Sequence, residues 1–177
     1  MSKEKRLAEA QENEDWKTYF GLLNSNQILR ELYGARDDFD SDKEFFELLG
    51  EHWSRLGKFA LYWNNLAEDF RLASQHDYFK EAMMSEDEYE EFEQLPNWFT
   101  IYRGYSQDKL KEGFCWTLDQ KRAELFAKEF ATIDDIPRVV IGHVQKANVT
   151  AYKNDHQRKE IIALSEHVEF VEEYEVL

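Results

Sequence analysis

Three short segments in the C-terminal half carry side chains that could do chemistry together. Arg103 ends the apolar run WFTIYR and is followed at once by Gly104. An arginine at a strand end can hold a phosphate through two parallel hydrogen bonds, and a glycine lets a ligand approach the backbone. The second segment, GFCWTLD, places Cys115 and Thr117 two residues apart, and the third places Glu160 at the start of an apolar run after a very polar loop. These residues are the candidates for a functional site.

Other catalytic signatures are missing from the sequence. It holds no P-loop, no Rossmann glycine fingerprint, no HExxH helix and no GxSxG elbow. The five histidines show no ligand spacing on any one element, so we expect no metal site. Cys115 is the only cysteine, which excludes an intramolecular disulfide and a cysteine-rich zinc site. A nucleophilic pair of Cys115 with His143 or His156 stays open, although the spacing does not favour it.

The elements that must position these residues change in character at Pro96. After it come six short runs of β-branched and aromatic residues, which are typical of strands. A helix is expected between the second and third runs, with Asp119 as its N-cap and Phe130 at its end. The expected strands are 98–103, 114–117, 138–144, 149–152, 161–164 and 168–176.

The first half is expected to be helical. Its clearest helix is predicted over 52–74, where apolar residues recur every three or four positions on one stripe. We interpret the aromatics of that stripe as core residues, with stacking on a ring or base as the alternative. Acidic residues dominate 81–93, which is predicted to be a solvated amphipathic helix or, alternatively, a partner surface. Further helices are expected over 3–20, after an asparagine cap at 24 or 26, and after Ser41.

Helices followed by strands predict an α+β fold, with an acidic helical region over 1–95 and a β-rich region over 96–177 in one compact unit. The net charge is −15. Residues 1–95 hold 11 basic and 23 acidic residues, and residues 96–177 hold 11 and 14. Most of the excess therefore lies in the helical half. Such a chain lacks the basic footprint of non-specific nucleic-acid or anionic-membrane binding.

The N-terminal segment is charged, unlike a signal peptide, and no apolar stretch is long enough to span a bilayer. With a single cysteine, the simplest expected location is the cytoplasm.

The segment from about 98 to 170 resembles the arginine–serine–glutamate class of ADP-ribosyltransferases. This class, the cholera-toxin and C3-like group, contains bacterial toxins, phage enzymes and vertebrate ecto-enzymes. The family's motifs occur here in the family's order: YRG comes first, GxxWTxD followed by AxxFA comes second, and EII comes third. The resemblance covers less than half of the chain. It implies a mainly antiparallel β-sandwich core in the second half, against which the helical half packs.

The resemblance implies a role for each matching residue, with NAD as the substrate. Glu160 would be catalytic, binding the 2′-hydroxyl of the nicotinamide ribose. Breaking the ribose–nicotinamide bond develops positive charge on the sugar, and a fixed carboxylate stabilises that charge most in the transition state. NAD-binding roles would fall to Arg103 at the phosphate, Gly104 at the nicotinamide amide, and Cys115, Trp116, Thr117 and Tyr152.

Two positions depart from the family pattern. Cys115 stands where the family has a serine, and a thiol is a weaker hydrogen-bond donor. Arg158 stands two residues before Glu160, where enzymes that modify arginine have glutamate or glutamine. A cation there would repel an incoming guanidinium, so a neutral or anionic acceptor is expected. Gln157 and Arg158 are accordingly predicted to select the acceptor.

The sequence therefore predicts a mono-ADP-ribosyltransferase of the small toxin or phage type, acting on a protein or nucleic acid. The alternatives are an NAD glycohydrolase, in which water is the acceptor, and a non-catalytic binding module with an acidic docking face. An inhibitory or antitoxin protein is a further candidate partner, and no membrane partner is expected.

Overall fold

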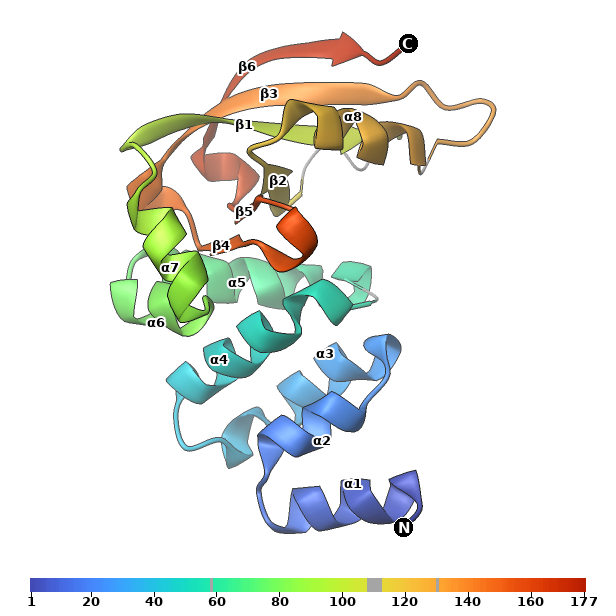
Figure 1. Cartoon of the computed structure of the whole chain (residues 1–177), viewed down its shortest axis with the longest axis vertical. Helices are drawn as coiled ribbons and strands as arrows, with labels where there is room; N and C mark the ends of the chain where they lie inside the picture. Colours follow the sequence, from blue (N-terminus) through green and yellow to red (C-terminus); the bar gives the residue numbers. More distant parts are fainter. Residues whose placement is uncertain (58, 108–112, 130) are drawn as a thin grey trace.

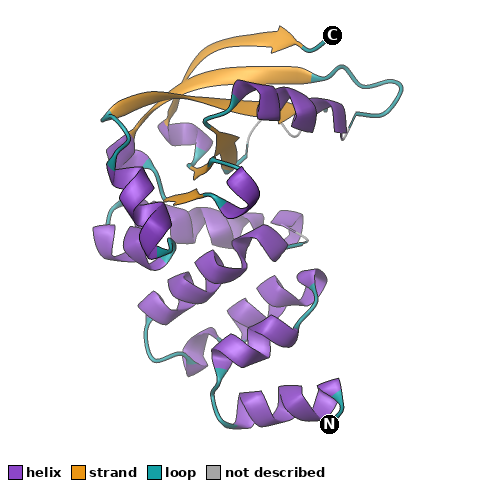
Figure 2. Cartoon of the chain, viewed as in Figure 1, coloured by secondary structure: helices purple, strands orange, loops and turns teal. Residues whose placement is uncertain are grey.

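The computed structural model describes residues 1–57, 59–107, 113–129 and 131–177. Helices form the N-terminal half, and a six-stranded antiparallel sheet dominates the C-terminal half (Figure 1). The two termini lie at opposite ends of the long axis, with the first helices at one end and the longest strands, together with one helix of the second half, at the other (Figure 2). The expected α+β class with a helical first half is confirmed. Among the described residues, no helix is both long and apolar enough to cross a membrane.

The helices of the first half begin where side chains satisfy their free N–H groups. Asn24 and Gln27 form a capping box at the start of α3, Ser41 caps α4, and Ser85 with Glu88 forms a capping box at α7. The α-helices are α1 (Lys3–Glu12), α2 (Trp16–Leu22), α3 (Ser25–Gly34), α4 (Asp42–His52), α5 (Trp63–Ser74), α6 (Asp77–Ala82) and α7 (Glu86–Glu93), with 3₁₀ turns η1 (Arg36–Asp38), η2 (Trp53–Arg55) and η3 (Phe59–Tyr62).

Two expected helices are each interrupted by a break. The segment 3–20 breaks where Glu14 adopts a positive φ of 54°, and Asp15 then caps α2 through Thr18. The segment 81–93 breaks because Ser85 starts a new helix instead of continuing the old one. Periodicity alone did not reveal these breaks, since the apolar pattern runs across both of them.

The single helix predicted over 52–74 is wrong. Helix α4 ends at His52, the chain turns through η2, and Leu56 is extended with φ −66° and ψ 136°. The N–H of Gly57 donates to the carbonyl of Ser25 at 3.0 Å, so a tertiary contact replaces the helical bond. Helix α5 begins only at Trp63, and residue 58 lies outside the described residues. Trp53 therefore belongs to a turn and not to the stripe of α5.

All six expected strand regions form strands, with boundaries shifted by up to two residues. Asp119 caps the expected helix by accepting from the N–H groups of Lys121 and Arg122, while Phe130 lies outside the described residues. The elements are β1 (Trp98–Tyr105), β2 (Cys115–Thr117), α8 (Gln120–Glu129), β3 (Arg138–Gln145), η5 (Lys146–Asn148), β4 (Ala151–Lys153), η6 (Asp155–Gln157), β5 (Glu160–Ile162), η7 (Ser165–His167) and β6 (Val168–Glu175).

The sheet has the order β4-β5-β2-β1-β3-β6 and consists of two well-paired parts. Strands β1 and β3 pair over eight positions, and β3 pairs with β6 across one bulge. Strand β5 pairs with β2 on one side and β4 on the other. Between the two parts, the described residues give a single registered pair, Tyr102 with Thr117. The short strands β2, β5 and β4 step down toward the helical half (Figure 1).

Buried side chains join the two halves into one core. Phe114, just before β2, stacks on Trp63 with ring centroids 3.9 Å apart and meets Phe70 edge-on at 5.1 Å. Both partners come from α5, which lies close to the short strands. The packing therefore ties β2 directly to the helical half.

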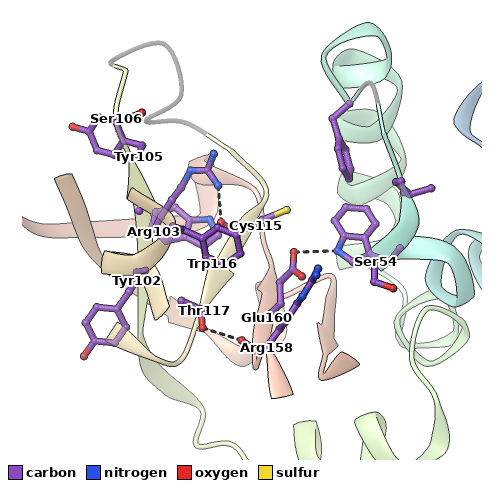
Figure 3. A pocket seen from close by; sticks show the side chains of 16 residues that line it. Ser54, Tyr102, Arg103, Tyr105, Ser106, Cys115, Trp116, Thr117, Arg158 and Glu160 are labelled. Carbon is purple, nitrogen blue, oxygen red and sulfur yellow. Dashed lines mark hydrogen bonds between the residues drawn. The ribbon is translucent and has the colours of Figure 1, made fainter. Parts of the chain in front are cut away.

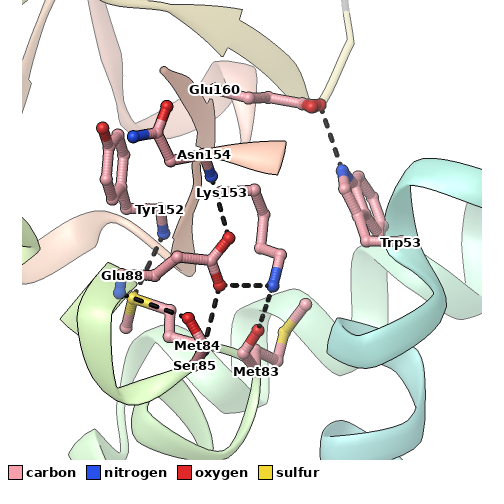
Figure 4. Close-up of polar contacts among 9 residues, drawn as sticks. All are labelled: Trp53, Met83, Met84, Ser85, Glu88, Tyr152, Lys153, Asn154 and Glu160. Carbon is pink, nitrogen blue, oxygen red and sulfur yellow. Dashed lines mark hydrogen bonds and ion pairs between the residues drawn. The ribbon is translucent and has the colours of Figure 1, made fainter. Parts of the chain in front are cut away.

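A buried ion pair makes a second connection between the halves (Figure 4). Lys153 at the end of β4 donates to Glu88 of α7 at 2.6 Å, and both side chains are less than a tenth exposed. Burial disfavours the charged form of Glu88, but Lys153 and the N–H groups of Ser85 and Asn154 outweigh it and lower the pKa of the carboxyl. The start of the 153–159 loop is thus anchored to α7.

Helix α8 packs closely on β1 at Gly104. A Cβ atom at this position would lie 1.9 Å from the carbonyl oxygen of Ala123. We therefore expect Gly104→Ala to push α8 from the sheet and to lower the free energy of unfolding by about 1–3 kcal/mol, as overpacking does. Urea denaturation measures this change.

Gly21→Ala is the matched control. Gly21 lies in α2 with no atom within 4 Å of an added Cβ. The same substitution there should stabilise the fold by about 0.4–1 kcal/mol. Equal effects of the two substitutions would contradict the close helix–strand contact.

Candidate functional site

A pocket of about 320 Å³ opens where β1 and β2 diverge, and it lies between the sheet and the helical half (Figure 3). Its walls come from β1, β2, β5 and α8, and its opposite side comes from the turns η2 and η3. Its size is within the range of small-molecule sites. Arg103, Gly104, Cys115, Trp116, Thr117, Arg158 and Glu160, all predicted site residues, line it.

Arg103 is held in the cleft between β1 and β2. Its Nη1 donates to the carbonyl oxygen of Cys115 at 2.6 Å. Its guanidinium lies over Gly113, where an added Cβ would come within 2.1 Å of Nη2. Burial lowers the pKa of Arg103, and the nearby Cys115 and Glu160 partly oppose this shift. The guanidinium still remains charged at neutral pH. The site therefore contains a positioned, largely desolvated cation.

Strands β2 and β5 bring the polar residues together. Thr117 is registered opposite Glu160, and Cys115 lies two residues along the same strand, on the same face. The hydroxyl of Thr117 donates to the carbonyl of Arg158 at 3.1 Å and accepts from the N–H of Asp119 at 3.1 Å. Thr117 thus fixes both the segment before Glu160 and the start of α8.

The Cys115 thiol is neutral in this environment. Burial raises its pKa well above the ordinary value, and the charge and hydrogen bonding of Glu160 raise it further, while Arg103 opposes both. A neutral thiol is a weak donor. Cys115 therefore offers Glu160 a weaker hydrogen bond than a serine hydroxyl would.

The helical half supplies a strong donor to Glu160. The indole Nε1 of Trp53 donates to Oε1 of Glu160 at 3.1 Å (Figure 4). Trp53 is 3% exposed and lies edge-on to Phe59 and Phe70, with centroids 5.2 and 5.7 Å away. The indole is consequently fixed by packing at the point where the two halves meet.

The loop before Glu160 has an unusual backbone. His156, Gln157 and Lys159 all have positive φ, at 55°, 59° and 47°. Each such residue costs of order 1 kcal/mol, and they cluster at ligand-binding and active sites. Arg158 in this loop lines the pocket, and its Nε is buried with no hydrogen-bond partner among the described residues. The pocket is thus lined by a second cation besides Arg103.

Two predicted site residues lie outside the pocket lining. Tyr152 is 3% exposed, and its hydroxyl donates to Glu91 of α7 at 2.7 Å. Gln157 is exposed at the end of η6. Trp116 lines the pocket but is only 2% exposed and lies edge-on to Phe170 of β6. Tyr152 therefore joins its strand to α7, and Trp116 packs its strand against β6.

Sequence reasoning missed the side of the pocket formed by the helical half. Trp53, Ser54, Leu56 and Phe59 all line it. Their pattern favoured a core helix, and stacking of the aromatics on a ring or base was only the alternative. Gly113 is the first residue of the GxxWTxD motif, but the sequence did not predict that it lies against Arg103. Among the described residues, no three His, Cys, Asp or Glu side chains gather as a metal site.

Comparison of the chain with protein-family models, curated proteins and solved structures gave no significant match. The family resemblance therefore rests on the sequence motifs alone.

The raised pKa of Cys115 predicts slow alkylation. Each unit by which a thiol pKa exceeds the pH lowers the reactive thiolate about tenfold. At pH 8, we expect iodoacetamide to label native Cys115 at least about tenfold more slowly than the urea-unfolded chain. Glu160→Gln should speed labelling of the native protein, because it removes a charge that raises the pKa. Equal rates for the native and unfolded protein would contradict the assignment.

Proposed function

We propose that this protein is a mono-ADP-ribosyltransferase that transfers ADP-ribose from NAD to a macromolecule, a protein or a nucleic acid, and releases nicotinamide. The observation that carries the proposal is that Arg103 of β1 and Glu160 of β5 line one pocket, with β2 between them. These are the two charged residues of the family pattern. In this proposal, the two well-paired parts of the six-stranded sheet take the place of the β-sandwich core of that family.

The chemistry of the pocket fits an NAD dinucleotide. Arg103 binds the diphosphate, because a guanidinium offers two parallel donors to phosphate oxygens. Glu160 accepts a hydrogen bond from the 2′-hydroxyl of the nicotinamide ribose. The apolar faces of Phe59 and Phe126, which also line the pocket, exclude water from the reacting bond.

The reaction is a displacement at the ribose C1′. The bond from C1′ to the nicotinamide nitrogen breaks, and its electron pair leaves with nicotinamide. The positive charge that develops on the sugar is stabilised by the Glu160 carboxylate. The acceptor atom then forms a bond to C1′ and loses its proton to solvent. Arg158, which lines the pocket beside Glu160, disfavours an arginine acceptor by charge repulsion.

Nicotinamide release tests the reaction. We expect Glu160→Gln to lower the rate of release at least about 100-fold, because an amide cannot stabilise positive charge as a carboxylate does. Glu166→Gln is the matched control, since Glu166 is exposed and pairs with Arg71 of α5, outside the pocket. Its release rate should equal that of the wild type. Background-level release from both the wild type and Glu160→Gln would instead favour a non-catalytic binding module.

Labelling identifies the acceptor. The protein is incubated with tagged NAD and a cell extract, with portions treated afterwards by protease or nuclease. We expect the label to be lost with one of these treatments and to map to a group other than arginine. Label on arginine would overturn the role given to Arg158. Free ADP-ribose without any labelled macromolecule would identify an NAD glycohydrolase instead.

A further inference from the structure

Trp53 occupies a place that no motif assigns. It lies far from Glu160 in sequence, in the turn η2 of the helical half, yet it makes a side-chain hydrogen bond to the carboxylate. An indole N–H can only donate, and a hydrogen bond to an ionised acceptor is about twice as strong as one between neutral groups. The contact therefore holds the Glu160 carboxylate in one orientation.

The indole is itself held in place. Phe59 and Phe70 contact its ring from η3 and α5, and the side chain is almost fully buried. Aromatic contacts of this kind fix the ring plane and hence the direction of the N–H. The donor is thus preorganised, and no reordering is needed when substrate binds.

The hydrogen bond leaves the carboxylate with capacity for a substrate. A carboxylate has about four lone-pair sites, and Trp53 uses one, on Oε1. Glu160 is only partly buried and lines the pocket, so its remaining sites can accept from a ligand hydroxyl. Cys115, two residues along β2 from Thr117, is a neutral thiol and a weak donor.

We propose that Trp53 is a positioning residue for Glu160, so that the helical half completes the catalytic site. This inference rests on the proposed transferase function. In it, the indole N–H orients the carboxylate toward the ribose, a task for which the thiol of Cys115 is poorly suited.

The test uses full-length protein and NAD, with nicotinamide release as the readout. Trp53→Phe keeps an aromatic ring between Phe59 and Phe70 but removes the donor. We expect kcat to fall about 10- to 100-fold, as when groups that orient metal ligands are removed, with KM for NAD nearly unchanged. In the Glu160→Gln background, Trp53→Phe should cause no further loss.

Trp16→Phe is the matched control. Trp16 is a buried tryptophan that packs edge-on against Tyr19 and Phe39, away from the pocket. Its replacement should lower the melting temperature without lowering kcat. A site-specific benzothienylalanine at 53, in which sulfur replaces the N–H, keeps the indole shape. It should reproduce the loss in kcat even where Trp53→Phe impairs folding.

Each outcome decides between the two claims. If the wild type releases nicotinamide faster than the Glu160→Gln variant does, and the benzothienylalanine protein is fully active, the positioning role alone is overturned. Faster release without the N–H would also overturn it and would mark Trp53 as a brake. An additional loss in the Glu160→Gln background would show that Trp53 acts elsewhere. No wild-type release above Glu160→Gln would overturn the transferase proposal, and the positioning role with it.

Discussion

The Glu160 carboxylate lies partly out of water, at the place where the two halves of the chain meet. Removing an ionised group from water costs several kcal/mol unless donors and opposite charges replace its hydration. Here the indole of Trp53 donates to Glu160, and Arg103 and Arg158 line the same pocket. No single element supplies these groups. The helical half and the separated strands must therefore pack together for Glu160 to be stable in its position.

The divergence of the sheet makes room for those groups. Among the described residues, β1 and β2 are registered at one pair only, so the two strands separate beside Arg103 instead of pairing continuously. Two glycines allow close packing around this gap between the strands. Gly113 leaves space for the guanidinium, and Gly104 lets α8 approach β1.

The sequence revealed the positions of the strands along the chain well, because each carries a local pattern of β-branched and aromatic residues between polar turns. It did not reveal the order of the strands in the sheet. It also indicated Arg103, the Cys115–Thr117 strand and Glu160, since these lie on or beside those strands. The interruption at Leu56 and Gly57 was not predictable, because its cause is a contact with Ser25 in another helix. Local periodicity contains no information on such a contact.

Trp53 shows the same limit most clearly. Its spacing fitted a helical stripe, and its actual partner is a residue in another half of the chain. The role of a side chain that acts through a long-range hydrogen bond emerges only from the fold. Conversely, Tyr152 had the expected strand position, but the structure directs its hydroxyl to Glu91.

The helical half contacts both ends of the segment that leads to Glu160. Glu88 of α7 holds Lys153 and Asn154 at the start of the loop, and Trp53 holds the carboxylate at its end. Between these anchors lie Arg158 and three residues with positive φ. A strained loop persists only when its surroundings over-determine it. The orientation of Glu160 and the placement of Arg158 are therefore coupled through the helices, so a change in the helical half should alter both side chains.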